Sequence, residues 1–232
     1  GAALGAAIAI IVLPVSLQGI ATPVAAFAGA LIITLLVFRL AQGENGTSII
    51  MLLLAGIAVS AFSGALIGFL NVIADDQALR DLTLWQMGAV SRASTNTLIM
   101  CATVMCLVGW YFQRHCQSLN ALLLGEAEAR FLGIDVERLK IKLIIAATIG
   151  IGVTVSVAGI IGFVGLVIPH LVRMLVGPDH RVLLPLSACC GAILLLLADI
   201  GARSLMSPAE LPVGLLTAVV GAPFFTYLLI KQ

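Results

Sequence analysis

Long apolar runs, separated by short polar or Pro/Gly-rich stretches, dominate the pattern of this chain. Eight runs can be delimited, at residues 1–13, 23–38, 48–70, 95–112, 143–158, 160–176, 183–202 and 212–230. A helix needs about 20 apolar residues to cross a bilayer, and several runs approach that length while others are shorter. Short segments are tolerated in lipid only where neighbouring protein covers their backbone. The pattern therefore predicts an all-α fold, a polytopic bundle of transmembrane helices packed against one another.

Composition supports a surface that faces lipid. The 232 residues are 61% hydrophobic and only 10% charged, whereas a soluble domain carries about 25% charged residues. The 23 glycines allow close helix packing. A net charge of +1 gives no reason to expect a nucleic acid partner. The five cysteines lack the spacing of a metal site, so they are interpreted as small hydrophobic residues.

The basic residues predict the orientation of the bundle. Alternation of the runs puts 14–22, 71–94, the turn near 159 and 203–211 on one side of the membrane. The other side then receives 39–47, 113–142, 177–182 and the C-terminus. Of the 12 lysines and arginines, nine fall on the second side and three on the first. Because cytoplasmic segments carry the excess of basic residues, we expect the second side and the C-terminus to be cytoplasmic.

The 113–142 segment holds the densest charge in the chain. Its sequence predicts a short helix over 121–132, with Asn120 as N-cap and Gly133 as the glycine that ends it. Glu126 and Arg130 are four residues apart and are expected to pair. A second helix is expected to start after Asp135 and to lead into the next span. Two short helices on the cytoplasmic side suit docking of a soluble partner, but the pattern equally allows an amphipathic helix on lipid headgroups.

The sixth run begins with glycines at every third position, Gly159, Gly162 and Gly165, and Pro169 follows within it. This spacing predicts a tight reversal and a short, bent helix packed closely on a neighbour. His170 could be an intramembrane ligand or proton relay. A histidine packed near the helix end is the interpretation that we favour.

Asp199 and Arg203 lie four residues apart near the external end of the seventh run, so a helical ion pair is expected. Glu210 is expected in an external loop. The chain contains no HExxH, GxSxG or Walker A motif. We therefore expect no catalytic group and no metal site, and any ATP would be bound by another chain.

Four stretches together carry a resemblance to a known family: LLLGEAEARFLGI (122–134), AGIIGFVGLVIPHLVRMLVGPDHRVLLP (158–185), LLLADIGAR (195–203) and ELPVGLLTAVVGAPFF (210–225). They resemble the FecCD family, the permease subunits of type II ABC importers for ferric siderophores, haem and cobalamin. The resemblance extends from about residue 1 to the end. It implies a single permease domain, 1–232, that begins inside the third of roughly ten helices.

The resemblance also implies roles for individual residues. An ATPase-coupling motif, which seats in a groove of the ATPase subunit, is matched by Leu124, Gly125, Glu126, Ala129, Arg130, Leu132 and Gly133. Arg203 matches an external arginine that pairs with a glutamate of the substrate-binding protein, which weakens the case for its pairing with Asp199. The pathway is expected between two copies, along about 48–70 and 212–230.

The expected assembly is a homodimer in the bacterial inner membrane, with two ATPase subunits that hold ATP and Mg²⁺ and one periplasmic binding protein. This chain itself would hold no cofactor and would work by alternating access. Haem is the first expected substrate, followed by ferric siderophore and cobalamin. Two other classes of membrane protein fit the sequence less well. A membrane enzyme would need paired intramembrane catalytic groups, and a passive channel or anchor would have no use for the docking helix.

Overall fold

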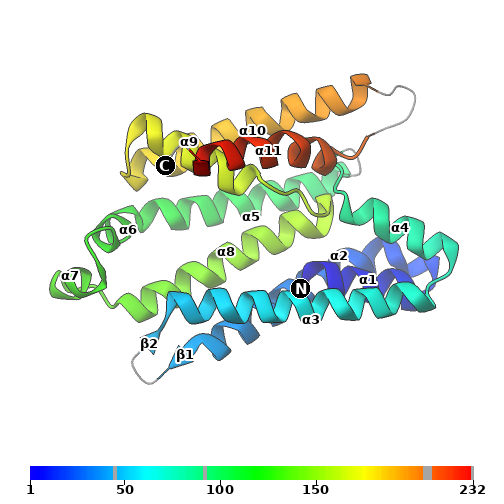
Figure 1. Cartoon of the computed structure of the whole chain (residues 1–232), viewed down its shortest axis with the longest axis horizontal. Coiled ribbons are helices and arrows are strands. Elements are labelled where there is room, and N and C mark those ends of the chain that lie inside the picture. Colours follow the sequence, from blue (N-terminus) through cyan, green and yellow to red (C-terminus); the bar gives the residue numbers. More distant parts are fainter. Residues whose placement is uncertain (44–45, 91–92, 206–210, 231–232) are drawn as a thin grey trace. The chain divides into compact units, whose positions relative to one another are not determined.

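The computed structural model describes residues 1–43, 46–90, 93–205 and 211–230. Arg92 and Lys231, which contribute to the predicted orientation, and Glu210, which is predicted in an external loop, lie outside these residues. Within the described ranges the fold is all-α, apart from one hairpin of two-residue strands, β1 (Gln42–Gly43) and β2 (Gly46–Thr47) (Figure 1). The helices are α1 (Ala2–Val12), α2 (Val15–Ala41), α3 (Ile49–Ile73), α4 (Asp76–Gln86), α5 (Thr95–Arg114), α6 (Cys116–Leu122), α7 (Glu126–Phe131), α8 (Val136–Ala158), α9 (Val164–Val176), α10 (His180–Leu205) and α11 (Val213–Ile230).

The eight predicted apolar runs each correspond to one helix: α1, α2, α3, α5, α8, α9, α10 and α11. Five of these, α2, α3, α5, α8 and α10, are long and apolar enough to cross a membrane. The polytopic helical bundle predicted from the sequence is therefore confirmed.

Two predicted connections differ from expectation. The 14–22 stretch is mostly helical, because Pro14 is the N-cap of α2 and the chain turns only at Leu13 and Pro14. The polar 71–88 stretch contains α4, whose start is capped by Asp75, since the Ala78 amide donates to Asp75 Oδ1 at 2.7 Å. Both differences shorten the connections between helices.

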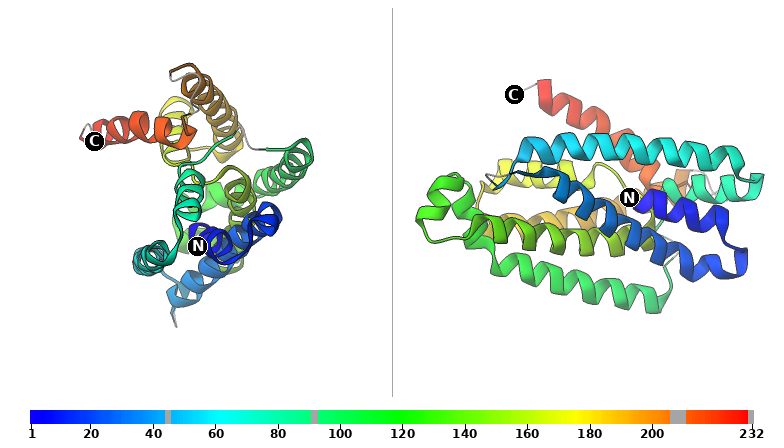
Figure 2. Two further views of the ribbon diagram at one scale, coloured as in Figure 1. Left: turned by 90° about the vertical axis from the view of Figure 1, so that its right-hand side faces the viewer. Right: turned by 90° about the horizontal axis from the view of Figure 1, so that it is seen from below.

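The chain forms two compact units, 1–86 with 140–159, and 87–139 with 160–232. The first unit is organised by the packing of α1 along α2 (Figure 2, right). A Cβ on Gly29 would lie 2.6 Å from the carbonyl oxygen of Gly1 and 3.2 Å from Gly5 Cα, so the two backbones meet through glycine. Ala6, Ala7 and Ala26 are fully buried beside this crossing. Such close approach is how helices gain contact in lipid, where burial of apolar surface drives little.

In the second unit, α10 packs against α5, α6, α9 and α11. Buried clusters join α9 to α10 through Ile168, Val172 and Leu183, and α10 to α11 through Ala198, Ala202 and Val213. Because α10 contacts every other spanning helix of this unit, it is the element through which a displacement at one end can reach the others.

The glycine-rich start of the sixth run is non-helical, and the short helix that follows it, α9, packs on α10, as predicted. α8 ends at Ala158, and Gly159 (φ 72°) begins the non-helical stretch before α9. A Cβ on Gly162 or Gly165 would meet nothing within 4 Å, so within the chain α9 contacts α10 through larger side chains, and the packing role of these two glycines stays a prediction. Pro169 lies inside α9, and His170 is half-buried on the same helix.

Candidate functional site

The 113–142 segment begins where a membrane-spanning helix ends. α5 is apolar up to its last turn, where the guanidinium carbon of Arg114 lies 4.8 Å from the ring centroid of Trp110. Tryptophan and basic residues gather at the boundary between lipid and water. We therefore place the membrane surface at this turn. α6 and α7 follow beyond the end of α5 (Figure 1), so we infer that they lie outside the lipid.

The predicted single helix over 121–132 is wrong, because the chain breaks between α6 and α7 at residues 123–125. Gly125 adopts φ 120° and ψ 158°, outside the helical region, and is the N-cap of α7. A Cβ at this position would collide with the carboxylate of Glu128. Asn120 is not an N-cap, since it lies inside α6. Gly125 therefore separates two short helices with independent directions.

The end of α7 is fixed by a Schellman motif around Gly133, as the sequence predicted. The Gly133 amide donates to the carbonyl of Arg130 at 2.9 Å, and the Ile134 amide donates to that of Ala129 at 3.1 Å. Gly133 has φ 83°, the left-handed conformation that this motif requires. α8 then starts at once, with Asp135 Oδ1 accepting from the Arg138 amide at 3.1 Å. The second expected helix is therefore the first part of α8.

The surface of this segment is unusually apolar for a part of the chain outside the lipid. The side chains of Leu124, Phe131 and Leu132 are 66%, 92% and 64% exposed. Ala129, within α7, is fully buried. Arg130 Nη2 lies 3.8 Å from Glu137 Oε1, and this ion pair connects α7 to the start of α8. The predicted pairing of Glu126 with Arg130 stays a prediction. The segment thus presents three large apolar side chains on a short, capped scaffold.

The same segment is hydrogen-bonded to the turn between α9 and α10, which the sequence analysis did not foresee. The Asn120 Nδ2 amide donates to Asp179 Oδ1 at 2.6 Å, and Asn120 Oδ1 accepts from the His180 amide at 2.9 Å. His180 Nδ1 lies 2.7 Å from the same oxygen, which can only accept, so Nδ1 carries the proton. The Gln113 amide donates to the carbonyl of Arg181 at 3.0 Å. The Cys116 thiol lies 3.4 Å from the carbonyl of His180.

Asp179 and Cys116, which both take part in this contact, each have a shifted pKa. The pKa of Asp179 is lowered, mainly because its carboxylate accepts from the Arg181 amide and next because it accepts from Asn120. The pKa of the Cys116 thiol is raised, mainly by burial and further by the negative charge of Asp179. Both shifts favour the state in which Asp179 is an acceptor and Cys116 is a neutral thiol.

The opposite end of this unit gathers segments that the sequence assigned to the external side. A Cβ on Gly88 would lie 2.6 Å from the carbonyl oxygen of Ile160, and one on Gly214 would lie 2.9 Å from that oxygen. The stretches near 88, 160 and 214 therefore meet, as the predicted alternation requires. Arg203, on the last turn of α10, has its Nε 2.8 Å from Asp199 Oδ2. The helical ion pair predicted for these two residues is confirmed.

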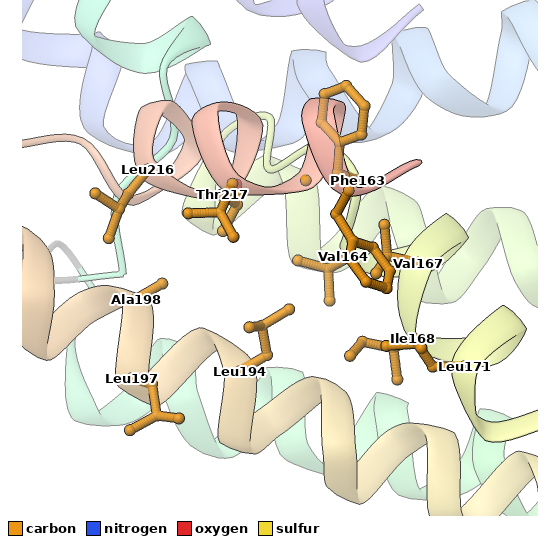
Figure 3. A pocket seen from close by; sticks show the side chains of 13 residues that line it. Phe163, Val164, Val167, Ile168, Leu171, Leu194, Leu197, Ala198, Leu216 and Thr217 are labelled. Atoms are coloured by element: carbon orange, nitrogen blue, oxygen red, sulfur yellow. The ribbon is translucent and has the colours of Figure 1, made fainter. Parts of the chain in front are cut away.

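A cavity of about 360 Å³ lies between α9, α10 and α11 (Figure 3). Its walls are almost wholly apolar, with Val167 and Ile168 from α9, Leu194 and Leu197 from α10, and Leu216 from α11. Phe163 lines it from the turn before α9, where its φ is 67°, which is rare for an aromatic residue. A Cβ on Gly221 would lie 2.5 Å from Phe163 Cβ, so α11 contacts this turn through a glycine.

Comparison with known proteins places the chain. Residues 1–231 match the FecCD transport family. The hemin transport system permease protein HmuU of Yersinia pestis is 45% identical over 230 residues, covering 96% of this chain and 68% of that protein. The vitamin B12 import system permease protein BtuC of Vibrio vulnificus is 41% identical, covering 100% and 70%.

A solved structure supports the same placement. It is described as an inward-facing conformation of a metal-chelate type ABC transporter. It superposes with a TM-score of 0.86 at 34% identity, covering 100% of this chain and 73% of that one. This chain belongs to the FecCD transport family, whose members are permease subunits of ABC importers.

Proposed function

We propose that this protein is the membrane-spanning subunit of an ATP-driven importer of metal chelates. We propose further that its 113–142 segment, called the coupling segment below, docks on the ATPase subunit and is moved by it. The observation that carries the proposal is the exposure of Leu124, Phe131 and Leu132 on a segment outside the lipid. Apolar side chains that are exposed together on a polar part of a protein mark an interaction surface. The Gly125 break and the Gly133 motif hold that surface in one shape.

A lipid headgroup is a weaker candidate for the partner of this surface. An interfacial helix needs a long apolar face and a polar face rich in lysine and arginine. α6 and α7 have only seven and six residues, and α7 carries Glu126 and Glu128 beside its single Arg130. Anionic lipid would repel this acidic helix, whereas a groove on a soluble protein would accept it.

The remaining partners follow from the family. We propose a homodimer embedded in lipid, two ATPase subunits that bind ATP and Mg²⁺, and a periplasmic protein that delivers the chelate to the side that carries Arg203. The membrane chain makes and breaks no covalent bond and holds no metal or cofactor of its own. Its role is to alternate access between the two sides when the ATPases close.

The chelate that we propose first is haem, since a hemin permease is among the most similar relatives. Cobalamin is the second candidate on the same ground, and a ferric siderophore is the third. The test is ATP-dependent uptake into proteoliposomes that contain the complete transporter, with haemin, cyanocobalamin and a ferric hydroxamate each offered alone. Preferential uptake of haemin supports the proposal, and uptake of only another chelate reassigns the substrate.

The docking role is tested by reversing one charge on α7. Glu126→Arg is expected to abolish co-purification of the ATPase or to uncouple ATP hydrolysis from uptake. Glu128→Arg is the matched control, because two residues place it about 200° around the helix from Glu126. Equal co-purification and equal uptake for wild type and Glu126→Arg would refute the docking role.

A further inference from the structure

Three polar side chains on one face of the chain reach the same turn. Gln113, Cys116 and Asn120 are spaced i, i+3 and i+7, which places them on one side of the helical path from the end of α5 through α6. Their partners are the consecutive residues Asp179, His180 and Arg181, at the start of α10. The contacts link residues about 60 positions apart in the sequence, so they are tertiary interactions and not local turns.

Asn120 is the central member of this set because it bonds to both charged and backbone groups. Its amide nitrogen donates to the Asp179 carboxylate, and its oxygen accepts from the backbone and the ring of His180. Asp179 in turn caps α10, since its Oδ1 accepts from the Arg181 amide at 3.0 Å. A displacement of α6 therefore acts directly on the residue that caps α10.

α10 carries the effect of such a displacement to the far side. It runs from His180 to Leu205, with Pro185 in its second turn, packs on α9 and α11, and holds Arg203 in its last turn. The walls of the apolar cavity include Leu194 and Leu197 of the same helix. Pro185 removes one backbone hydrogen bond near the start of α10. From there to Leu205 the helix moves as one body more readily than it bends, because bending disturbs its backbone hydrogen bonds.

We propose that Asn120 is a positioning residue of the transport cycle, which locks the coupling segment to the start of α10 so that movement of the segment by the ATPase is transmitted along α10. The proposal rests on the proposed function, since it assumes that the 113–142 segment is moved by an ATPase. Gln113 strengthens the lock, and the buried Cys116 fills the space between α6 and the start of α10.

The test exchanges the two partners of the shortest hydrogen bond. In Asn120→Asp, a second carboxylate faces Asp179 and repels it. In the double variant Asn120→Asp with Asp179→Asn, the new amide on residue 179 donates to the new carboxylate on residue 120, so the complementarity is restored with its direction reversed. Asn96→Asp, at an exposed position near the start of α5, makes the same chemical change away from the contact.

Uptake of haemin and hydrolysis of ATP are measured together in proteoliposomes that contain the complete transporter, and co-purification of the ATPase is followed in parallel. If the wild type carries cyanocobalamin instead, that chelate replaces haemin. Asn120→Asp is expected to lower the amount of chelate moved per ATP about fivefold or more, with the ATPase still bound. The double variant is expected to return to within about twofold of wild type, and Asn96→Asp to match wild type.

Unchanged coupling in Asn120→Asp would overturn the proposal, and so would an assembled double variant no better coupled than Asn120→Asp. If Asn120→Asp is not recovered from membranes, Gln113→Ala is tested in its place, because it removes one hydrogen bond of the same set. An unchanged amount of chelate moved per ATP in Gln113→Ala would then overturn the proposal. Absence of ATP-dependent uptake by the wild type would be a failure of the proposed function. Wild-type uptake with unaltered coupling in the variants would remove only the role of Asn120.

Discussion

Arg203 Nε donates to Asp199 Oδ2 at 2.8 Å across one turn of α10, in the last part of that helix. The Arg203 side chain is 52% exposed and that of Asp199 is 20% exposed. A guanidinium has five N–H donors, so Nε can remain with Asp199 while the outer nitrogens bind a second carboxylate. The internal ion pair and the proposed contact with a binding protein are therefore compatible, but they compete for the same positive charge.

This competition predicts opposite effects for the two charge changes. Asp199→Asn leaves Arg203 with its full positive charge, and affinity for the binding protein is expected to rise about two- to fivefold, which corresponds to the free energy of an exposed ion pair. Arg203→Glu is expected to weaken docking. Both are measured as the dissociation constant of the binding protein from the transporter in nanodiscs. An identical affinity for wild type and Arg203→Glu would remove the docking role of this arginine.

The two glycines of the coupling segment allow a matched comparison. Gly133 has open space around a Cβ, so Gly133→Ala should cost only the left-handed conformation, about 1–2 kcal/mol. Gly125→Ala should cost more, because φ 120° with ψ 158° is a backbone conformation that is essentially restricted to glycine, although the Glu128 carboxylate, the end of a flexible side chain, can move away from the new methyl group. We expect Gly125→Ala to reduce association with the ATPase more than Gly133→Ala does, as measured by co-purification. A larger loss for Gly133→Ala would contradict this account.

Much of the fold could be predicted because lipid imposes a simple rule on sequence. Each of the eight apolar runs corresponds to a helix. The start of α8 after Asp135 and the end of α7 before Gly133 were predicted from the capping residues. The ion pair of Asp199 with Arg203 was also visible, because both residues lie on one helix. These features depend on local spacing or on hydropathy, which a single sequence displays directly.

The features that the sequence did not predict depend on contacts between distant segments. Asn120 looked like a helix cap because it precedes an apolar stretch, but its side chain bonds to Asp179 and His180, and helix α6 begins before it. The spacing of Gln113, Cys116 and Asn120 on one side of the helical path is visible in the sequence. No local pattern shows which segment these three side chains contact. α4 had a signal that could have been used, namely Asp75 as cap followed by Leu82 and Trp85 on one buried face.

The buried thiol of Cys116, in the contact with α10, should react slowly with thiol reagents. Cys116 is only 2% exposed, and both burial and Asp179 raise its pKa, so little reactive thiolate forms near neutral pH. Labelling of Cys116 by a water-soluble maleimide is expected to be more than about tenfold slower than that of a Leu124→Cys variant, because it requires local opening. Mass spectrometry of the labelled peptides measures both rates. Similar rates would show that α6 does not stay packed on the start of α10.

The contact between Phe163 and Gly221 should be sensitive to a single methyl group. A Cβ on Gly221 would lie 2.5 Å from Phe163 Cβ, so Gly221→Ala is expected to destabilise the protein by about 1–3 kcal/mol. Gly191→Ala is the matched control, since its Cβ would meet only Val164 Cγ1, at an ordinary 3.7 Å, within helix α10. There, the higher helix propensity of alanine should leave stability equal or slightly raised.

Phe163→Gly should relieve the clash at Gly221 as well as the strain of a positive φ. The penalty of Gly221→Ala should therefore largely disappear in the Phe163→Gly background, giving a coupling free energy above about 1 kcal/mol in a double-mutant cycle. Thermal unfolding of the four purified proteins in one detergent measures it. If the two changes were additive, the cost of Gly221→Ala would have to arise elsewhere along α11, because removal of the Phe163 Cβ leaves no atom of that side chain for the new methyl group to meet.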